Sequence, residues 1–351
     1  MTPNILATII LGCLCILTPK SKITCIIVFF FMWTLWAFNV WNGDYVSYME
    51  EYYFTKWDTI EFGYRAICNF FSPWLPFTGF IMLISAFILG FFCYCGLKYT
   101  QYPGLYALFY FPMFILEFVF IRNYICLIIL FYSFFRIIYE DKNTFGSVLL
   151  IILATTIHIF SICFLPIVFL LRSNFNYKSL VILVVFLTVI VIIASQTVIQ
   201  STSYIASKAG AYARAGGNSI SLTTPFHILM VGIAYFIYKH ARVTSHKDRQ
   251  IMKYFMSFNI LSLILLPVYF IMPYAASRSL RLLVVMDVFF YLFILYNTSK
   301  RTKLYSRSGL LFLAVTIGYF FSIQKFEFVV EPLYFCNLLW GYNPKYQLIS
   351  Y

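Results

Sequence analysis

The sequence predicts an all-α, polytopic integral membrane protein, a single membrane domain over residues 1–351 with about 11–12 transmembrane helices. Its composition is 62% hydrophobic and only 11% charged, whereas soluble domains carry roughly 25% charged residues. Apolar runs long enough to cross a bilayer recur from one end of the chain to the other. These runs do not show the alternation of apolar and polar residues that is typical of membrane β-strands.

The apolar runs also fix the order of the expected helices. They lie near residues 4–18, 23–41, 77–97, 104–120, 122–139, 145–157, 159–171, 179–196, 225–241, 251–272, 282–298 and 309–323. One alternative stays open, because the run 145–171 fits either one long span or two short spans that meet at His158.

The distribution of charge favours two short spans. With that count, one side of the membrane receives 16 of the 25 Lys and Arg and three acidic residues. This is the bias of cytoplasmic loops, so the net charge of +13 does not indicate a nucleic-acid partner. Both termini are then predicted to be periplasmic, and residues 42–76 and 197–224 form extracytoplasmic loops.

A polar segment, residues 42–72, separates the second and third expected spans. It contains the acids Asp44, Glu50, Glu51, Asp58 and Glu61, together with Lys56, Arg65 and several tyrosines. Residues 44–55 are expected to form a helix at the membrane interface, because tyrosines favour that depth. Asp44 and Glu61 are candidates to activate an acceptor hydroxyl, whereas the other three acids are expected to be solvated.

Four arginines are candidates to bind an anion. Arg122 interrupts an apolar run, where a charge is costly and usually faces a cavity or a partner; the alternatives are an interfacial position or a pair with Glu117. Arg278 and Arg281 share one face of a helix, and two adjacent guanidinium groups suit a diphosphate. Arg214 lies in the Ala- and Gly-rich segment KAGAYARAGG.

His158 lies at the expected break within 145–171. A lone His on an apolar helix is most often a core residue, but a break exposes backbone groups that must line a cavity. We therefore expect His158 to accept a proton or to contact a phosphate. The sequence has no Gly-rich phosphate loop and no Asp-x-Asp pair, so neither a nucleotide cofactor nor a metal is expected.

Several short motifs resemble the EpsG/Wzy-type polysaccharide polymerases of bacterial O-antigen and exopolysaccharide clusters. The motifs are Gly43-Asp44-Tyr45 with Tyr48, Glu61-Phe62-Gly63-Tyr64, Arg122-Asn123, His158 with Ser161, the basic helix start at Arg278/Arg281, and Tyr342-Asn343-Pro344-Lys345-Tyr346. Two positions depart from the family pattern. Arg122 is followed by Asn123 where Gln is common, and the spacing from His158 to Ser161 is wider than usual.

The resemblance implies a metal-independent glycosyltransferase in the bacterial inner (plasma) membrane. Such a polymerase moves a growing glycan from undecaprenyl diphosphate to a lipid-linked repeat unit on the periplasmic face, and a chain-length regulator is a possible protein partner. Arg122, Arg278, Arg281 and Arg214 would bind the diphosphate, and Glu61, Asp44 or His158 would activate the acceptor. Two alternatives remain, a flippase for lipid-linked oligosaccharides and an O-antigen ligase.

Overall fold

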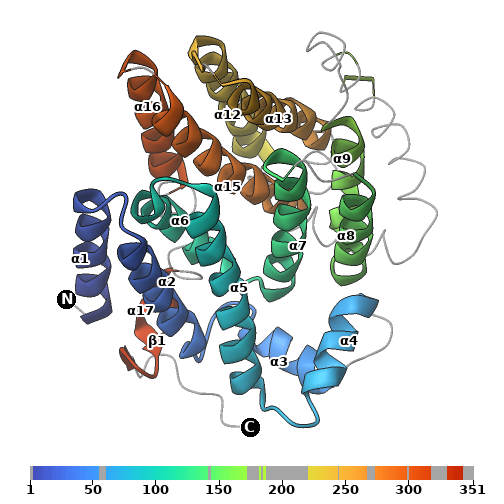
Figure 1. Cartoon of the computed structure of the whole chain (residues 1–351). Coiled ribbons are helices and arrows are strands. Elements are labelled where there is room, and N and C mark those ends of the chain that lie inside the picture. Colours follow the sequence, from blue (N-terminus) through green and yellow to red (C-terminus); the bar gives the residue numbers. More distant parts are fainter. Residues whose placement is uncertain are drawn as a thin grey trace. The chain divides into compact units, whose positions relative to one another are not determined.

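A computed structural model describes residues 3–54, 61–140, 144–171, 182, 185–186, 220–243, 245–266, 273–298, 300–317 and 330–342. Within these ranges the chain forms fourteen α-helices, two short 3-10 helices and a two-stranded sheet (Figure 1). Among the described residues, three helical segments are long and apolar enough to cross a membrane: Phe77–Tyr99, Ile121–Ile138 and Leu280–Asn297. Shorter apolar helices accompany them. The predicted all-α membrane fold is therefore confirmed.

The first two helices begin at residues suited to helix starts. Helix α1 (Pro3–Leu17) starts with a proline, whose fixed φ suits the first turn. Helix α2 (Lys22–Ala37) follows the cap residue Ser21, whose hydroxyl accepts a hydrogen bond of 3.1 Å from the Thr24 backbone N–H. Both helices are close to the predicted runs at 4–18 and 23–41.

The polar segment folds into two short helices, α3 (Tyr45–Tyr53) and α4 (Phe62–Phe71). Asn42-Gly43 forms the turn before α3, and the Asn42 side-chain oxygen accepts a 3.1 Å hydrogen bond from the Asp44 backbone N–H. Helix α3 covers residues 45–53 of the helix predicted over 44–55, whereas its position at the membrane interface stays a prediction.

Helices α5 (Phe77–Tyr99), α6 (Pro103–Glu117) and α7 (Ile121–Ile138) follow with short connections. A Cβ atom at Gly96 of α5 would come within 2.3 Å of the Tyr106 ring. Glycine is therefore the residue that lets α5 and α6 pack this closely, and Tyr106 is fully buried.

The run 145–171 forms two helical segments rather than one. Helix α8 (Thr144–Ile157) ends immediately before His158, and a 3-10 helix, η1 (Ile159–Phe164), leads into α9 (Leu165–Leu171). Pro166 lacks a backbone N–H and so suits the first turn of a new helix. The break was predicted at this residue, whereas the sides of the membrane on which the segments lie remain a prediction.

The later helices begin several residues before the apolar runs that predicted them. They are α12 (Ile220–His240), α13 (His246–Ser262), which continues into the 3-10 helix η2 (Leu263–Leu265), α15 (Pro273–Asn297) and α16 (Lys300–Ile317). Hydropathy marks only the part of a helix that suits hydrocarbon, whereas backbone hydrogen bonds continue into polar residues. For this reason α12 begins inside the loop predicted over 197–224. The expected span 179–196 lies almost entirely outside the described residues.

The C-terminal segment packs against the N-terminal helices. It contains α17 (Glu331–Phe335), β1 (Cys336–Asn337) and β2 (Gly341–Tyr342), and β1 and β2 are antiparallel. The Asn337 amide donates to the Leu35 carbonyl at 2.9 Å, and the Asn39 amide donates to the Pro332 carbonyl at 2.9 Å. The first bond satisfies a carbonyl at the end of α2, which a helix end leaves without a partner, and the second joins the residues after α2 to α17.

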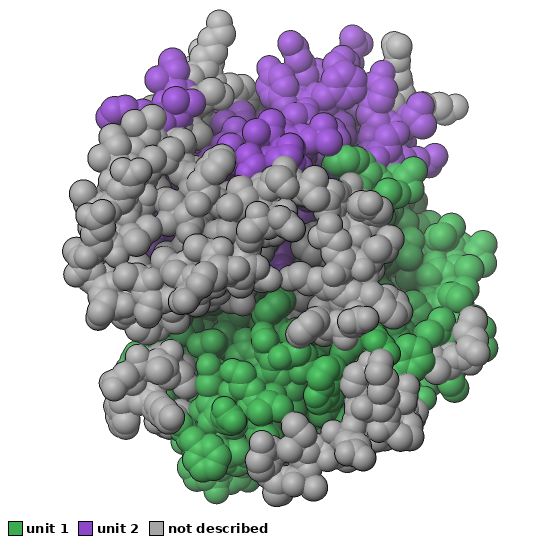
Figure 2. Space-filling model, turned by 180° about the vertical axis from the view of Figure 1, so that it is seen from behind, with its two compact units in different colours: residues 1–130, 152–159, 310–351 green, residues 131–151, 160–309 purple. Residues whose placement is uncertain are grey.

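The chain divides into two compact units, coloured in Figure 2. Unit 1 contains residues 1–130, 152–159 and 310–351, and unit 2 contains residues 131–151 and 160–309. Stacked aromatic rings form much of the unit 1 core, for example Trp36 with Tyr124 and Phe29 with Tyr110, both at 5.1 Å between centroids. Unit 2 is built mainly on α12, α13 and α15, whose buried faces are predominantly apolar.

Candidate functional site

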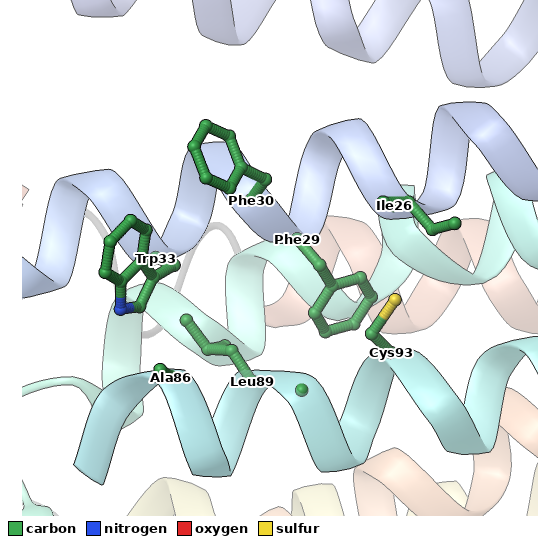
Figure 3. Close-up of a pocket in the computed structure, with 8 residues that line it drawn as sticks. Ile26, Phe29, Phe30, Trp33, Ala86, Leu89 and Cys93 are labelled. Carbon is green, nitrogen blue, oxygen red and sulfur yellow. The ribbon is translucent and has the colours of Figure 1, made fainter. Parts of the chain in front are cut away.

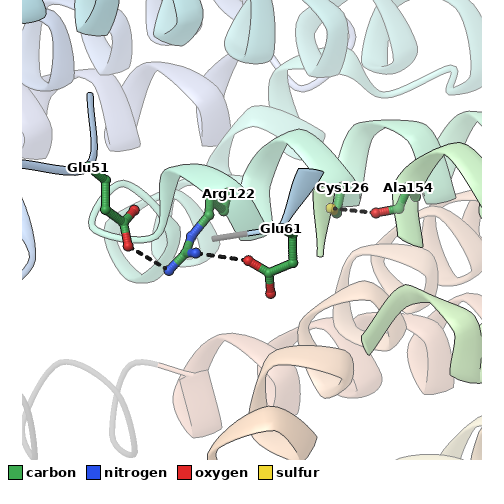
Figure 4. Close-up of polar contacts among 5 residues, drawn as sticks. All are labelled: Glu51, Glu61, Arg122, Cys126 and Ala154. Atoms are coloured by element: carbon green, nitrogen blue, oxygen red, sulfur yellow. Dashed lines mark hydrogen bonds and ion pairs between the residues drawn. The ribbon is translucent and has the colours of Figure 1, made fainter. Parts of the chain in front are cut away.

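A three-residue ion cluster within unit 1 joins α3, α7 and the residue that precedes α4. Arg122, in the first turn of α7, donates from Nη1 to Glu61 Oε2 at 3.0 Å. Its Nη2 atom lies 3.4 Å from Glu51 Oε1, on the last turns of α3. Figure 4 shows the guanidinium group between the two carboxylates. Each carboxylate therefore meets a different nitrogen of the same cation.

Two tyrosine rings complete the surroundings of Arg122. The guanidinium carbon lies 5.6 Å from the Tyr48 ring centroid and 5.5 Å from the Tyr64 ring centroid. These distances are those of cation–π contacts. Both rings are buried, and burial raises the pKa of Tyr64 well above its ordinary value, although Arg122 opposes that shift. Tyr64 therefore stays a neutral phenol at physiological pH.

Helix α3 is anchored so that Glu51 faces Arg122. The Tyr52 hydroxyl donates to the Leu75 carbonyl at 2.7 Å, and the Tyr53 hydroxyl accepts from the Phe77 backbone N–H at 2.9 Å. The Tyr52 ring also stacks on Phe80 of α5, with 4.9 Å between centroids. These contacts on the residues next to Glu51 hold the last turn of α3 against the start of α5.

Helix α4 is positioned by a close approach at Gly63. A Cβ atom there would lie 2.4 Å from the Thr156 hydroxyl oxygen and 2.9 Å from the Thr156 carbonyl carbon. Only glycine fits without moving the backbone. Thr156 is in the last turn of α8, which also accepts a 3.3 Å hydrogen bond from Cys126 of α7 at Ala154 (Figure 4). The end of α8 therefore supports both the α4 side and the α7 side of the ion cluster.

The cluster is partly accessible and carries a net negative charge. The side chains of Arg122, Glu51 and Glu61 are 22%, 20% and 11% exposed. One cation and two anions give a net charge of −1. Partial burial strengthens such contacts relative to a solvated surface pair. The guanidinium group is therefore not sealed from solvent.

The structure brings two of the predicted site residues into contact and corrects one expectation about a neighbouring acid. Arg122 and Glu61, both predicted candidates, are in direct contact. The prediction that Glu51 is solvated was wrong, because Glu51 forms an ion pair with Arg122. Asp44 immediately precedes α3, two turns before Glu51, and is half-buried. His158 is half-buried and follows Thr156 by two residues, and its backbone N–H donates to Ala154 at 2.9 Å.

The other predicted arginines belong to unit 2 or lie outside the described residues. Arg278 and Arg281 are both in α15, as expected for a helical pair, and Arg281 is 3% exposed. Arg214 lies outside the described residues, as does Asp58. The described residues contain no group of three or more His, Cys, Asp and Glu side chains arranged to hold a metal ion.

Sequence reasoning missed a second polar cluster, which lies inside unit 2. Asp287 of α15, Asn259 and Ser262 of α13, and His227 of α12 are all 0–1% exposed. The Asn259 amide donates to Asp287 at 2.7 Å, and His227 and Ser262 are joined at 2.7 Å. The available signal was a single acid in the apolar run LLVVMDVFFYL, because an ionisable residue within a span is a functional candidate.

An apolar cavity of about 360 Å³ lies between α2 and α5 (Figure 3). Its lining is Ile26, Phe29, Phe30, Trp33, Ala86, Leu89, Gly90 and Cys93. These side chains can contact hydrocarbon, but they supply no carboxylate and no cation. Acid–base or anion chemistry is therefore better supported by the ion cluster around Arg122.

The apolar helices and the partly exposed ion cluster together define a multi-pass membrane protein with a polar site supported at helix ends. Comparison with protein families then gives a specific assignment. Residues 22–336 match the model of the EpsG family, so the chain belongs to the EpsG family, which is linked to exopolysaccharide biosynthesis. No curated protein sequence and no solved structure matches the chain at a significant level.

Proposed function

We propose that this EpsG family protein is a polysaccharide polymerase. It transfers a growing glycan from undecaprenyl diphosphate to the acceptor sugar of a lipid-linked repeat unit, at the periplasmic face of the bacterial inner membrane. The observation that carries the proposal is the partly exposed contact of Arg122 with Glu51 and Glu61. A cation and a carboxylate in contact are the two groups that this reaction needs.

The cation stabilises the leaving group. Cleavage of the sugar–phosphate bond leaves negative charge on the diphosphate, and a guanidinium group aimed at that charge lowers the barrier. The Glu51 contact, at 3.4 Å, is longer than the Glu61 contact, at 3.0 Å. We therefore assign Glu51 as the partner that the diphosphate replaces on Arg122. Arg278, Arg281 and Arg214 are proposed to bind diphosphate as well, as basic residues expected on the same side of the membrane.

Glu61 is proposed as the general base. Its carboxylate takes the proton from the acceptor hydroxyl as that oxygen attacks the sugar carbon, and the bond from this carbon to the diphosphate breaks. Without bound donor, Glu61 forms an ion pair with the positively charged Arg122, which favours the charged carboxylate and makes Glu61 a weak base. A diphosphate bound to Arg122 offsets that positive charge, so binding of the donor makes Glu61 a stronger base. Asp44 and His158 are the other candidates for this role.

Complementation in a strain that lacks its own polymerase tests the function. The intact protein should restore a ladder of long polysaccharide chains on a gel. Arg122→Ala, Arg278→Ala and His158→Ala should each lose the long chains, although the variants still reach the membrane fraction on an immunoblot. If the intact protein restores no chains, the polymerase assignment is wrong. If all three variants restore full-length chains, the site assignment is wrong.

The same strain separates the polymerase from a flippase. Transporters place ionisable groups near the middle of the membrane, and Asp287, an ionisable residue near the middle of α15, is the observation that favours a flippase. Loss of a flippase leaves repeat units on the cytoplasmic side, so no repeat unit reaches its final acceptor. Loss of a polymerase still allows single repeat units to be transferred. Single-unit products in the null strain, converted to long chains by this protein, support the polymerase.

A further inference from the structure

The buried polar cluster of unit 2 is separate from the proposed glycan chemistry. Asp287 is the fifteenth residue of α15, which runs over 25 residues from Pro273 to Asn297. Its side chain is fully buried, and the ion pairs of the described part of the chain do not include it. Arg281, six residues earlier on the same helix, lies on a different face, because 3.6 residues make one turn.

The hydrogen bonds around Asp287 leave two buried oxygen atoms without donors among the described residues. Asn259 donates from Nδ2 to Asp287 Oδ1 at 2.7 Å and to the Phe255 carbonyl at 3.2 Å. Asp287 Oδ2 and Asn259 Oδ1 have no hydrogen-bond partner there. Two neighbouring side chains therefore each present an unsatisfied acceptor, and a buried polar atom without a partner is costly.

One added proton turns one of these two unsatisfied acceptors into a donor. Protonation of Asp287 at Oδ2 turns that atom into a donor, and Asn259 Oδ1 is an acceptor on the side chain already bonded to Asp287. It also removes a negative charge that burial strongly disfavours. We propose that Asp287 is a proton-binding site inside the unit 2 helix bundle. Only its neutral carboxyl form is compatible with the packing of α13 against α15, so release of the proton weakens this contact.

Among the described residues, the groups that the structure places around the site do not supply a compensating positive charge. On α15 itself the titratable neighbour is Tyr291, one turn after Asp287, and Ser306 of α16 donates to the Tyr291 carbonyl. On α13 the facing group is Asn259, which does not titrate. From α7, Phe131 and Phe135 pack on Phe289 of α15 and are apolar.

Helix α12 contributes His227, which joins the cluster through Ser262. The Ser262 hydroxyl donates to the Asn259 carbonyl at 2.5 Å, so its proton is already used. His227 Nε2, at 2.7 Å from the same oxygen, must then be the donor. The imidazole therefore carries its proton on Nε2, and this hydrogen-bond chain links α12 to the backbone of Asn259. The proton on Asp287 thus affects a contact that involves three helices.

Infrared spectroscopy of the full-length protein in lipid vesicles tests the proposal. At pH about 7, where an ordinary carboxyl group is ionised, we expect a carboxyl C=O stretching band from protonated Asp287. Asp287→Asn should remove this band, and Asp248→Asn should leave it unchanged, because Asp248 lies in the first turn of α13, outside the cluster. Absence of the band in the intact protein, or its persistence in Asp287→Asn, would overturn the proposal.

Two further measurements cover the remaining outcomes. If Asp287→Asn does not fold, Asn259→Leu replaces it, and loss of the donor to Oδ1 should move the band to higher frequency; an unmoved band contradicts the site. Replacing choline chloride by sodium chloride should change neither the band nor the thermal unfolding temperature. A band that disappears in sodium, with a raised unfolding temperature, would show a metal-cation site and would refute the proton.

Discussion

The two polar clusters of this protein differ in how their charge is balanced. The cluster around Arg122 in unit 1 contains full charges on three separate segments and is 11–22% exposed. The cluster around Asp287 in unit 2 is 0–1% exposed and joins neutral donors to a single carboxyl group. The first cluster is open to solvent, so we expect an anionic ligand to replace one of its carboxylates. The second cluster is closed to solvent, and in our proposal its packing depends on the proton bound to Asp287. The comparison suggests that ligand chemistry belongs to the first and conformational control to the second.

Removal of Arg122, the cation that joins Glu51 and Glu61 in the unit 1 ion cluster, should have the largest effect. Arg122→Ala leaves Glu51 and Glu61 facing each other and removes the group proposed to stabilise the leaving diphosphate. We expect polymerisation to fall about 100-fold or more, the size typical for loss of one transition-state donor. Chain formation by the purified protein from lipid-linked repeat units measures this. Arg122→Lys should recover only part of the activity, since an ammonium group cannot contact two anions as a guanidinium does.

The matched control for that variant is Arg136→Ala. Arg136 lies near the other end of α7 and also contacts an aromatic ring, with its guanidinium carbon 5.8 Å from the centroid of Tyr132. It has no part in the proposed chemistry, so its loss should change the turnover rate by less than about threefold, as for a surface contact. Equal losses of turnover in the Arg122 and Arg136 variants would mean that removal of any arginine from α7 lowers activity. The specific role proposed for Arg122 would then be wrong.

The two glutamates provide a comparison within one cluster. Glu61→Gln removes the proposed base and should lower the turnover rate by about 100-fold. Glu51→Gln removes only the partner that the diphosphate replaces, so it should lower KM for the donor lipid and change the turnover rate little. Separate measurement of kcat and KM for both variants distinguishes the roles. If Glu51→Gln abolishes turnover while Glu61→Gln keeps it, the two assignments are reversed.

The sequence predicted much of the unit 1 cluster but not its pairing. Arg122 stood out because it interrupts an apolar run, and Glu61 because it lies in a charge-rich segment. Their contact joins positions 61 residues apart, and neither local pattern nor hydropathy carries information on such a pair. Glu51 was predicted to be solvated because its neighbours are polar, but the tyrosine contacts of α3 turn it toward Arg122. Without those tertiary contacts, solvation was the better expectation.

The fold was predicted more fully than the unit 2 cluster. Apolar runs located most of the helices, because the hydrophobic requirement of a membrane span is strong and local. The contact of Asn39 with the Pro332 carbonyl, 293 residues apart, left no local signal. Asp287 was visible in the sequence but was counted as part of an apolar span. Its significance depends on Asn259, and only the packing of α13 against α15 shows that these residues meet.

The unit 2 cluster should show its effect in stability. Asn259→Ala removes the donor to Asp287 Oδ1 and leaves another buried acceptor without a partner, so we expect a loss of about 1–3 kcal/mol. Thermal unfolding in detergent measures this. The control is Asn297→Ala at the end of α15, where the amide donates to the Phe293 carbonyl and is only part-buried; its loss should cost about 0.5 kcal/mol or less. Similar losses for both variants would contradict a special role for the sealed cluster.

The smallest expected effect tests the anchor of the unit 1 cluster. Burial raises the pKa of Tyr52 to about 12. The neutral hydroxyl therefore contributes its full stabilisation of the fold below the ordinary tyrosine pKa of about 10, and this stabilisation is lost as pH rises toward 12. Tyr52→Phe removes the bond to the Leu75 carbonyl and should cost about 1 kcal/mol at neutral pH. Unfolding temperatures of the variant and the intact protein should converge as pH approaches 12. The exposed Tyr235→Phe should match the intact protein throughout. A constant gap for Tyr52→Phe would show that ring packing, not the hydroxyl, holds α3 beside Arg122.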